Sequence, residues 1–254
     1  MSGTRLRSRK APATEAGVKP ALLIVAHGER GGLRQDRLSH CLVGCLRSTG
    51  RYRDVQACFI SKEPTLKSVV TDLSPGPAMI YPLFMSDGYF VMQAIPKMLE
   101  EDDGRHVEVA APVGLSPGLP PLVADHADAA VQAAGRRVED HRLLLVAHGS
   151  KSDPASRNAA QCVAAELAMA NRFAGIELAF LEESPLLDDR IGQVEGPAVL
   201  VGLFAGEGLH GGVDLPDAVQ RSGRTDIVLS PPLARAPGLM DLIRDDLTRI
   251  AAPL

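Results

Sequence analysis

The chain has 254 residues, with 27 Lys and Arg against 31 Asp and Glu, a formal net charge of −4 and 45% apolar residues. The slightly acidic balance argues against a general nucleic-acid binder, and no apolar run approaches the roughly 20 residues needed to cross a bilayer. The charge balance therefore favours a small molecule as the partner. The four cysteines form no C-x-x-C pair, and we expect them to lie in a reducing cytoplasm.

The first 19 residues differ from the rest of the chain. They hold Arg5, Arg7, Arg9, Lys10 and Lys19 but no apolar segment of the kind found in a secretory signal. We therefore expect residues 1–19 to form a disordered tail.

Beyond this tail, short apolar runs alternate with segments of helical spacing. In the first half, strands are predicted over residues 21–26, 55–60, 78–84 and 107–111, and helices over 33–47, 65–73, 87–101 and 120–134. A polar link over residues 135–141 follows. In the second half, strands are predicted over 143–147, 176–181, 198–204 and 227–229, and helices over 154–171, 187–194, 212–221 and 237–250. Short apolar strands alternating with helices are typical of parallel sheets covered on both faces.

The two halves repeat each other. Ala26-His27-Gly28 recurs as Ala147-His148-Gly149 at an offset of 121 residues, and residues 58–64 and 83–90 have counterparts at 179–185 and 203–210. Landmarks that recur in the same order at offsets of 121 and 120 residues indicate a duplicated domain. We predict an α/β protein of two similar lobes, 20–135 and 141–254, each a four-stranded parallel sheet flanked by helices.

Three polar positions of the second half follow predicted strands: His148 the first, Glu182 and its neighbour Glu183 the second, and His210 the third. The carboxyl ends of parallel strands share one edge, where open α/β sheets bind ligands. Two imidazoles and a carboxylate can hold a divalent transition-metal ion, or one of them can accept a proton.

Other interpretations remain open for the same residues. His148 could be a buried histidine bonded to a neighbouring loop, His210 a polar residue of a glycine-rich turn, and the two glutamates solvated carboxylates. Ser150 beside His148 could be a nucleophile, although it does not lie in a G-x-S-x-G elbow, and the chain has no G-x-x-x-x-G-K-[ST] phosphate-binding loop. Cys41 and Cys45 could bind a metal or be small buried side chains.

Three segments in order carry a family resemblance: LLLVAHGS with Asn158 beyond it, AFLEESP, and VGLFAGEGLHGGVDLP. This arrangement resembles the sirohydrochlorin cobalto- and ferrochelatase family of class II tetrapyrrole chelatases. The resemblance implies a two-lobed fold that holds a macrocycle between the lobes, with His148, Glu182 and His210 as metal ligands and catalytic residues. It also implies no permanently bound cofactor, the substrates being a tetrapyrrole and a divalent cobalt, iron or nickel ion.

The first half departs from this pattern. It keeps His27 but has Ser61, Lys62 and Phe90 opposite Glu182, Glu183 and His210, so we expect a single active constellation, in the C-terminal lobe. A non-catalytic tetrapyrrole or metal carrier on the same fold is the alternative. Donors for ring carboxylates are sought among the basic residues near the strand ends, which are Lys151, Arg157, Arg30, Arg34 and Lys62.

Overall fold

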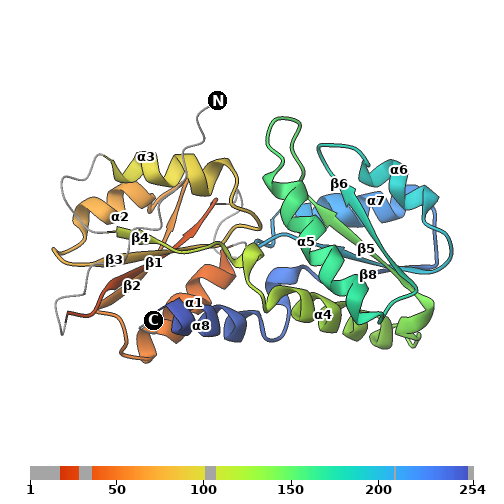
Figure 1. Ribbon diagram of the computed structural model, residues 1–254, viewed down its shortest axis with the longest axis horizontal. Coiled ribbons are helices and arrows are strands. Elements are labelled where there is room, and N and C mark those ends of the chain that lie inside the picture. The colour runs from red at the N-terminus through yellow and green to blue at the C-terminus, as the bar shows by residue number, and fades with distance from the viewer. Residues whose placement is uncertain (1–17, 29–35, 101–106, 209, 251–254) are drawn as a thin grey trace.

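The computed structural model describes residues 18–28, 36–100, 107–208 and 210–250 as two lobes of like build (Figure 1). The elements of the first half are β1 (Ala21–Ala26), α1 (Arg37–Ser48), β2 (Asp54–Phe59), α2 (Leu66–Asp72), β3 (Ala78–Pro82), α3 (Ile95–Leu99), β4 (Val107–Val109) and α4 (Leu119–Ala133). Those of the second half are β5 (Arg142–Ala147), α5 (Ala155–Ala170), β6 (Gly175–Phe180), α6 (Leu187–Gln193), β7 (Ala198–Gly202), α7 (Leu215–Ser222), β8 (Ile227–Leu229) and α8 (Leu239–Ile250).

The predicted α/β fold class is confirmed. Each lobe has a four-stranded sheet, in the order β2-β1-β3-β4 and β6-β5-β7-β8, and all neighbours are parallel. The register repeats as well, since Ala21 pairs with Asp54 as Arg142 pairs with Gly175. Residues 29–35 and 101–106, where predicted helices begin or end, lie outside the described residues, as do most of the predicted tail and Leu209.

Burial explains why β1 and β5 are continuously apolar. Both are central strands with helices on each face, and the five residues from Ala21 to Val25 have no exposed surface. Alternate residues then enter different cores: Leu144 packs with α6 and α7, whereas Leu143 joins a larger core that also contains Leu22 of the first lobe. The two lobes therefore share one hydrophobic core.

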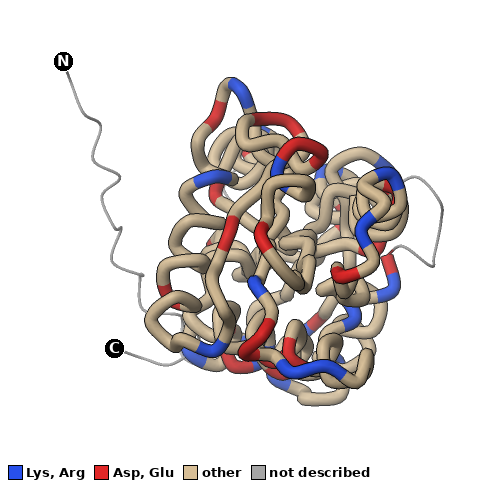
Figure 2. The backbone as a smooth tube through the Cα atoms, turned by 90° about the vertical axis from the view of Figure 1, so that its right-hand side faces the viewer, with Lys and Arg blue, Asp and Glu red and all other residues tan. Residues whose placement is uncertain are grey.

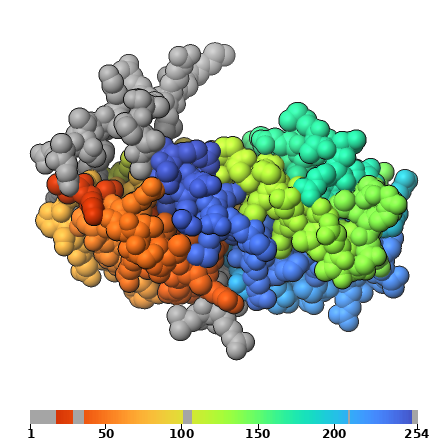
Figure 3. Space-filling model, turned by 90° about the horizontal axis from the view of Figure 1, so that it is seen from below, coloured from red at the N-terminus to blue at the C-terminus, as the bar shows by residue number. Residues whose placement is uncertain are grey.

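The last helix of each half crosses to the other lobe. Helix α4 packs on α5, β7 and β8. Helix α8 shares a core with α1, and α8 and α1 lie side by side in Figures 1 and 3. Buried polar groups secure both crossings: Asp246 of α8 accepts hydrogen bonds from the Tyr81 hydroxyl (2.7 Å) and the Ser116 hydroxyl (2.8 Å). Nε2 of His126, on α4, lies 2.8 Å from the carbonyl oxygen of Pro231. The packed lobes therefore do not follow the division near residues 135–141 that the sequence suggests.

Cys41 and Cys45 are not the small buried side chains that one interpretation of the sequence offered. Cys41 is exposed and Cys45 half-buried, because α1 turns Leu38, Leu42 and Leu46 to the core and these cysteines away from it. Only Cys58 is buried, and burial raises the pKa of its thiol to about 12.

None of the described helices has the length and apolar character to span a membrane. Acidic and basic residues are interspersed over the end of the molecule that Figure 2 shows.

Candidate functional site

The predicted residues of the second half do follow their strands. His148 comes directly after β5, Glu182 is the second residue after β6, and His210 lies in the segment between β7 and α7. The structure brings two of them together: the ring centres of His148 and His210 are 4.8 Å apart, with the ring planes at 90°. Two histidines that are 62 positions apart in sequence thus meet at the carboxyl edge of the sheet.

His210 opens a π-helical turn, His210–Asp214, immediately before α7. Its Nδ1 lies 2.7 Å from Oδ2 of Asp214, and its ring packs 5.6 Å from that of Phe204. A carboxylate at this distance favours the tautomer with the proton on Nδ1, which leaves Nε2 as the free ligand atom. Sequence reasoning missed Asp214, although its position four residues after a histidine in a helical segment was the available signal.

His148 is exposed, so its interpretation as a buried structural histidine is wrong. Its main chain is nevertheless fixed, because its carbonyl oxygen accepts hydrogen bonds from the N–H groups of Leu181 (3.1 Å) and Glu182 (3.0 Å). Its Nδ1 lies 2.9 Å from the carbonyl oxygen of Gly149. Nδ1–H donation to that oxygen again leaves Nε2 available.

Ser150 does not pair with His148 as a nucleophile would. Its hydroxyl oxygen accepts hydrogen bonds from the N–H groups of Ser152 (3.3 Å) and Asp153 (3.2 Å), which is the arrangement of a residue that stabilises a turn.

Glu182 stands apart from the two histidines. Its side chain is exposed and makes no hydrogen bond or ion pair with the described residues. Over the same residues, no three His, Cys, Asp or Glu side chains lie close enough together to form a ready set of metal ligands.

Glu183 is not the solvated carboxylate that one interpretation of the sequence offered. It is 8% exposed and forms an ion pair with Arg157, whose Nε donates to Oε2 at 2.9 Å. Lys62, its counterpart in the first half, is likewise paired with buried Asp36. Two of the candidate donors for ring carboxylates are therefore already engaged, Lys151 is exposed, and Arg30 and Arg34 lie outside the described residues.

The first lobe has a ring pair of similar geometry in which a phenylalanine replaces one histidine. The ring centres of His27 and Phe90 are 4.9 Å apart and the ring planes lie at 79°, close to the values for His148 and His210. Phe90 also opens a π-helical turn, Phe90–Ala94, and stacks on Phe84 as His210 packs on Phe204. A hydrocarbon ring thus occupies the position of the second imidazole.

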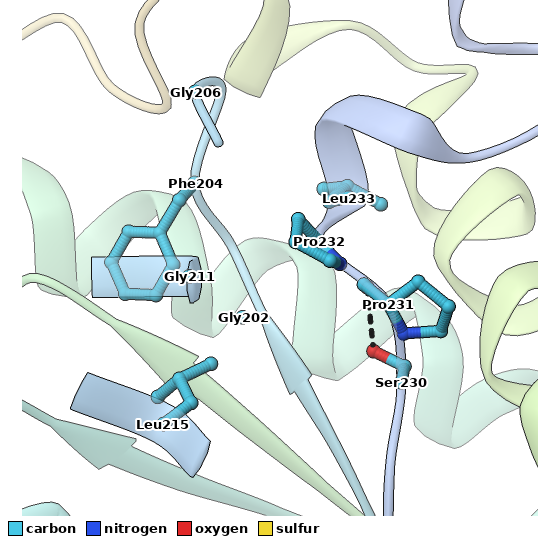
Figure 4. A pocket seen from close by; sticks show the side chains of 9 residues that line it. All are labelled: Gly202, Phe204, Gly206, Gly211, Leu215, Ser230, Pro231, Pro232 and Leu233. Carbon is cyan, nitrogen blue, oxygen red and sulfur yellow. Dashed lines mark hydrogen bonds between the residues drawn. The ribbon is translucent and has the colours of Figure 1, made fainter. Parts of the chain in front are cut away.

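A small apolar hollow lies beside the loop that carries His210 (Figure 4). Its walls come from the end of β7, the start of α7 and the segment after β8, and they consist of Gly202, Phe204, Gly206, Gly211, Leu215, Ser230, Pro231, Pro232 and Leu233. The Phe204 ring that packs on His210 is therefore also part of an apolar wall.

Two like lobes, each built on a parallel four-stranded sheet, are also the fold of solved two-lobed chelatases that match this chain, and here the paired histidines lie at the edge of one sheet. The sequence profile of the CbiX family matches residues 21–130 and again residues 142–250. The chain belongs to the CbiX family, and the double match agrees with the internal repeat.

Individual relatives agree with this assignment. A probable sirohydrochlorin cobaltochelatase of Halobacterium salinarum is 26% identical over 223 residues, covering 78% of this chain and 75% of that protein. The structure of CbiX, described as the terminal enzyme for biosynthesis of siroheme in denitrifying bacteria, has a TM-score of 0.75 and 28% identity over 91% of this chain and all of that one. SirB from Bacillus subtilis with Fe³⁺, at 18% identity and a TM-score of 0.75 over 92% and 96% of the two chains, shares the fold.

Proposed function

We propose that this chain inserts a divalent cobalt or iron ion into sirohydrochlorin or a related carboxylate-rich tetrapyrrole. Membership of the CbiX family and the names of its relatives support the chemistry. The observation that carries the proposal is the His148–His210 pair, 4.8 Å between ring centres. Two imidazoles that share one ion through bonds of roughly 2.0–2.1 Å have ring centres about 5 Å apart.

The proposed roles follow from which atoms are free. His148 and His210 hold the incoming ion through Nε2, since Nδ1 of each lies within hydrogen-bonding distance of an oxygen acceptor. Two open ligand positions suit delivery, because the ion must pass from the protein to the ring nitrogens.

Glu182 is the proposed proton acceptor. Insertion of a divalent ion into a free-base ring displaces two pyrrole N–H protons, and these must leave as the metal–nitrogen bonds form. An exposed carboxylate two residues beyond the end of β6, whose side chain has no partner among the described residues, can take a proton and pass it to water.

An anaerobic insertion assay tests the proposal, with cobalt, iron and nickel offered separately and loss of the free-base spectrum as the signal. Glu182→Gln keeps the size of the side chain and removes its basicity, so we expect insertion to slow by about 10²–10⁴-fold while ring binding changes little. Glu166→Gln, an exposed carboxylate on α5, is the matched control and should insert at the wild-type rate.

The carrier alternative predicts a different result. Wild-type protein would then bind the ring but accelerate insertion little over the metal ion in buffer, and Glu182→Gln would alter affinity alone. An unimpaired rate in Glu182→Gln would contradict the role given to this residue.

A further inference from the structure

The buried ion pair between Glu183 and Arg157 has no role in the function proposed above. Glu183 uses both carboxylate oxygens: Oε1 accepts from the N–H of Ser150 (3.2 Å), and Oε2 accepts from Arg157. Arg157 also donates from Nη2 to the carbonyl oxygen of Ser184 (3.1 Å) and lies over the ring of Phe180. One pair therefore joins the segment after β5 to the segment after β6.

The turn that follows His148 is built against Glu183. Gly149 has a φ of +74°, and a Cβ there would lie 2.7 Å from Cγ of Glu183 and 2.9 Å from Cβ of Phe180. Glycine thus allows a close approach that no other residue could make. Since Glu183 contacts the residue after His148 and is itself the residue after Glu182, it bears on both proposed site residues at once.

The first lobe contains the same device with the charges exchanged. Arg157 and Glu183 correspond, at the offset of 121 residues, to Asp36 and Lys62, which also form an ion pair with the carboxylate buried. Gly28 has a φ of +91°, and a Cβ there would lie 2.9 Å from Cγ of Lys62. Both lobes contain the ion pair. In the lobe that carries His148, Glu182 and His210, the residue that follows the strand, Glu183, supplies the carboxylate. In the first lobe the equivalent residue is Lys62, and it supplies the cation.

This difference in sign has a chemical consequence. A carboxylate at position 183 accepts the N–H of Ser150, and an ammonium group at that position has no acceptor to offer. Ion pairing alone would serve to tie two loops together in either orientation. The orientation in the second lobe adds a hydrogen bond to the backbone two residues beyond His148.

We propose that Glu183, held by Arg157, is a positioning residue for the metal site, acting through the Gly149–Ser150 turn on His148 and through the chain on Glu182. The inference rests on the proposed function, because it assigns Glu183 to the support of those two residues. Partners of this kind, which hold ligands without touching the metal, typically contribute about 10–100-fold to metal affinity or activity.

The test copies the first-lobe pair into the second lobe. The double variant Arg157→Asp with Glu183→Lys restores an ion pair at these positions but removes the acceptor for Ser150. We expect the double variant to be more thermally stable than either single variant and closer to wild type. Its cobalt affinity, read from the cobalt absorption spectrum, and its kcat for insertion should both remain about 10–100-fold below wild type. Its KM for the ring should change little.

Two further variants separate positioning from stability. Glu183→Gln retains an oxygen that can accept from Ser150 and loses the charge, so it should retain more activity than the double variant. Asp36→Asn breaks the equivalent pair in the first lobe and should lower the unfolding temperature without altering cobalt affinity.

Recovery of cobalt affinity and kcat in the double variant would overturn the inference, because ion pairing would then suffice. Equal loss of cobalt affinity in Asp36→Asn would also overturn it. Failure of wild-type protein to insert any metal would instead count against the proposed function, and the cobalt spectra of the same variants would still decide the role of Glu183.

Discussion

Asp214 shows how a neighbouring carboxylate can prepare a ligand before the metal arrives. Its Oδ2 lies 2.7 Å from Nδ1 of His210, so the imidazole holds its proton on Nδ1 when it donates to Asp214 and leaves Nε2 free. Such a partner fixes both the tautomer and the ring orientation, and makes the ligating nitrogen more basic.

We therefore predict that Asp214→Asn weakens cobalt binding by about 10–100-fold. An amide at this position can still bond to Nδ1, but it gives the imidazolium no charge stabilisation and does not select the tautomer. Titration of the cobalt absorption spectrum measures the effect, with Asp217→Asn, an exposed carboxylate of the same helix, as the control. Equal cobalt affinity in Asp214→Asn and wild type would contradict the role given to Asp214.

Single residues also mark the limit of what sequence can reveal. The position of His148 at a strand end was predictable, because an apolar run ends directly before it in a glycine turn, and His210 was predictable in the glycine-rich loop after the third strand. The burial of Glu183 was not, since its partner Arg157 lies 26 positions away and only the packing of α5 beside β6 brings the two together. A sequence that reads Glu-Glu gives no sign that one carboxylate is exposed and the other paired.

At the scale of elements, the two π-helical turns occupy equivalent places in the lobes, Phe90–Ala94 and His210–Asp214. Sequence spacing predicted ordinary helices over 87–101 and 212–221, because one extra residue in a turn barely changes a periodic pattern. Turns of this type are frequent at functional sites. Here each one presents the aromatic ring that faces the histidine after the first strand of its lobe.

The contact of β3 with α8 can be tested through Tyr81. Its hydroxyl donates to buried Asp246 at 2.7 Å, and burial together with this carboxylate raises the pKa of Tyr81. Tyr81→Phe removes a hydrogen bond to a charged acceptor, so we expect a loss of about 1.5–3 kcal/mol in the free energy of unfolding at pH 7. Chemical denaturation measures the change.

The pH dependence of this difference follows from the direction of the shift. Tyr81 stays protonated in the folded protein above the pH of about 10 at which an unfolded tyrosine ionises. The stabilisation is complete below that pH and declines above it as the unfolded state loses its proton. The gap between wild type and Tyr81→Phe should therefore narrow above about pH 10. A constant gap would mean that Tyr81 has no raised pKa in the folded protein.

For the whole molecule, the lobes are alike in build and unequal in chemistry. His27 faces Phe90 where His148 faces His210, so at this place the second lobe offers two imidazoles to one ion and the first lobe offers one. We predict that His148→Ala abolishes cobalt binding and insertion, while His27→Ala leaves cobalt binding intact and slows insertion less. Parallel titrations of the two variants provide the measurement. Equal loss in both, with folding intact, would show that both lobes work on the metal.

The exchange of α4 and α8 between lobes was the part of the architecture that sequence did not predict. A helical pattern with one apolar face shows that the face is buried, but it does not say against which sheet. Both helices have such a face, and the pattern alone would allow each to be assigned to its own half. The crossing depends on contacts between distant residues, such as Tyr81 with Asp246 and His126 with the carbonyl oxygen of Pro231.

The same exchange makes the chain suitable for circular permutation. Lys19 Nζ donates to the carbonyl oxygen of Gly50 (2.6 Å), and Arg51 donates to the hydroxyl of Thr248 (2.7 Å), so the segment before β1 and the end of α8 both lie against the loop after α1. A short linker from residue 250 to residue 20, with the chain opened within 135–141, leaves every helix on its sheet and reverses the order of the halves. We expect this permutant to unfold in one transition and to bind cobalt as wild type does, whereas either half expressed alone exposes the sheet face that the other half's helix covers.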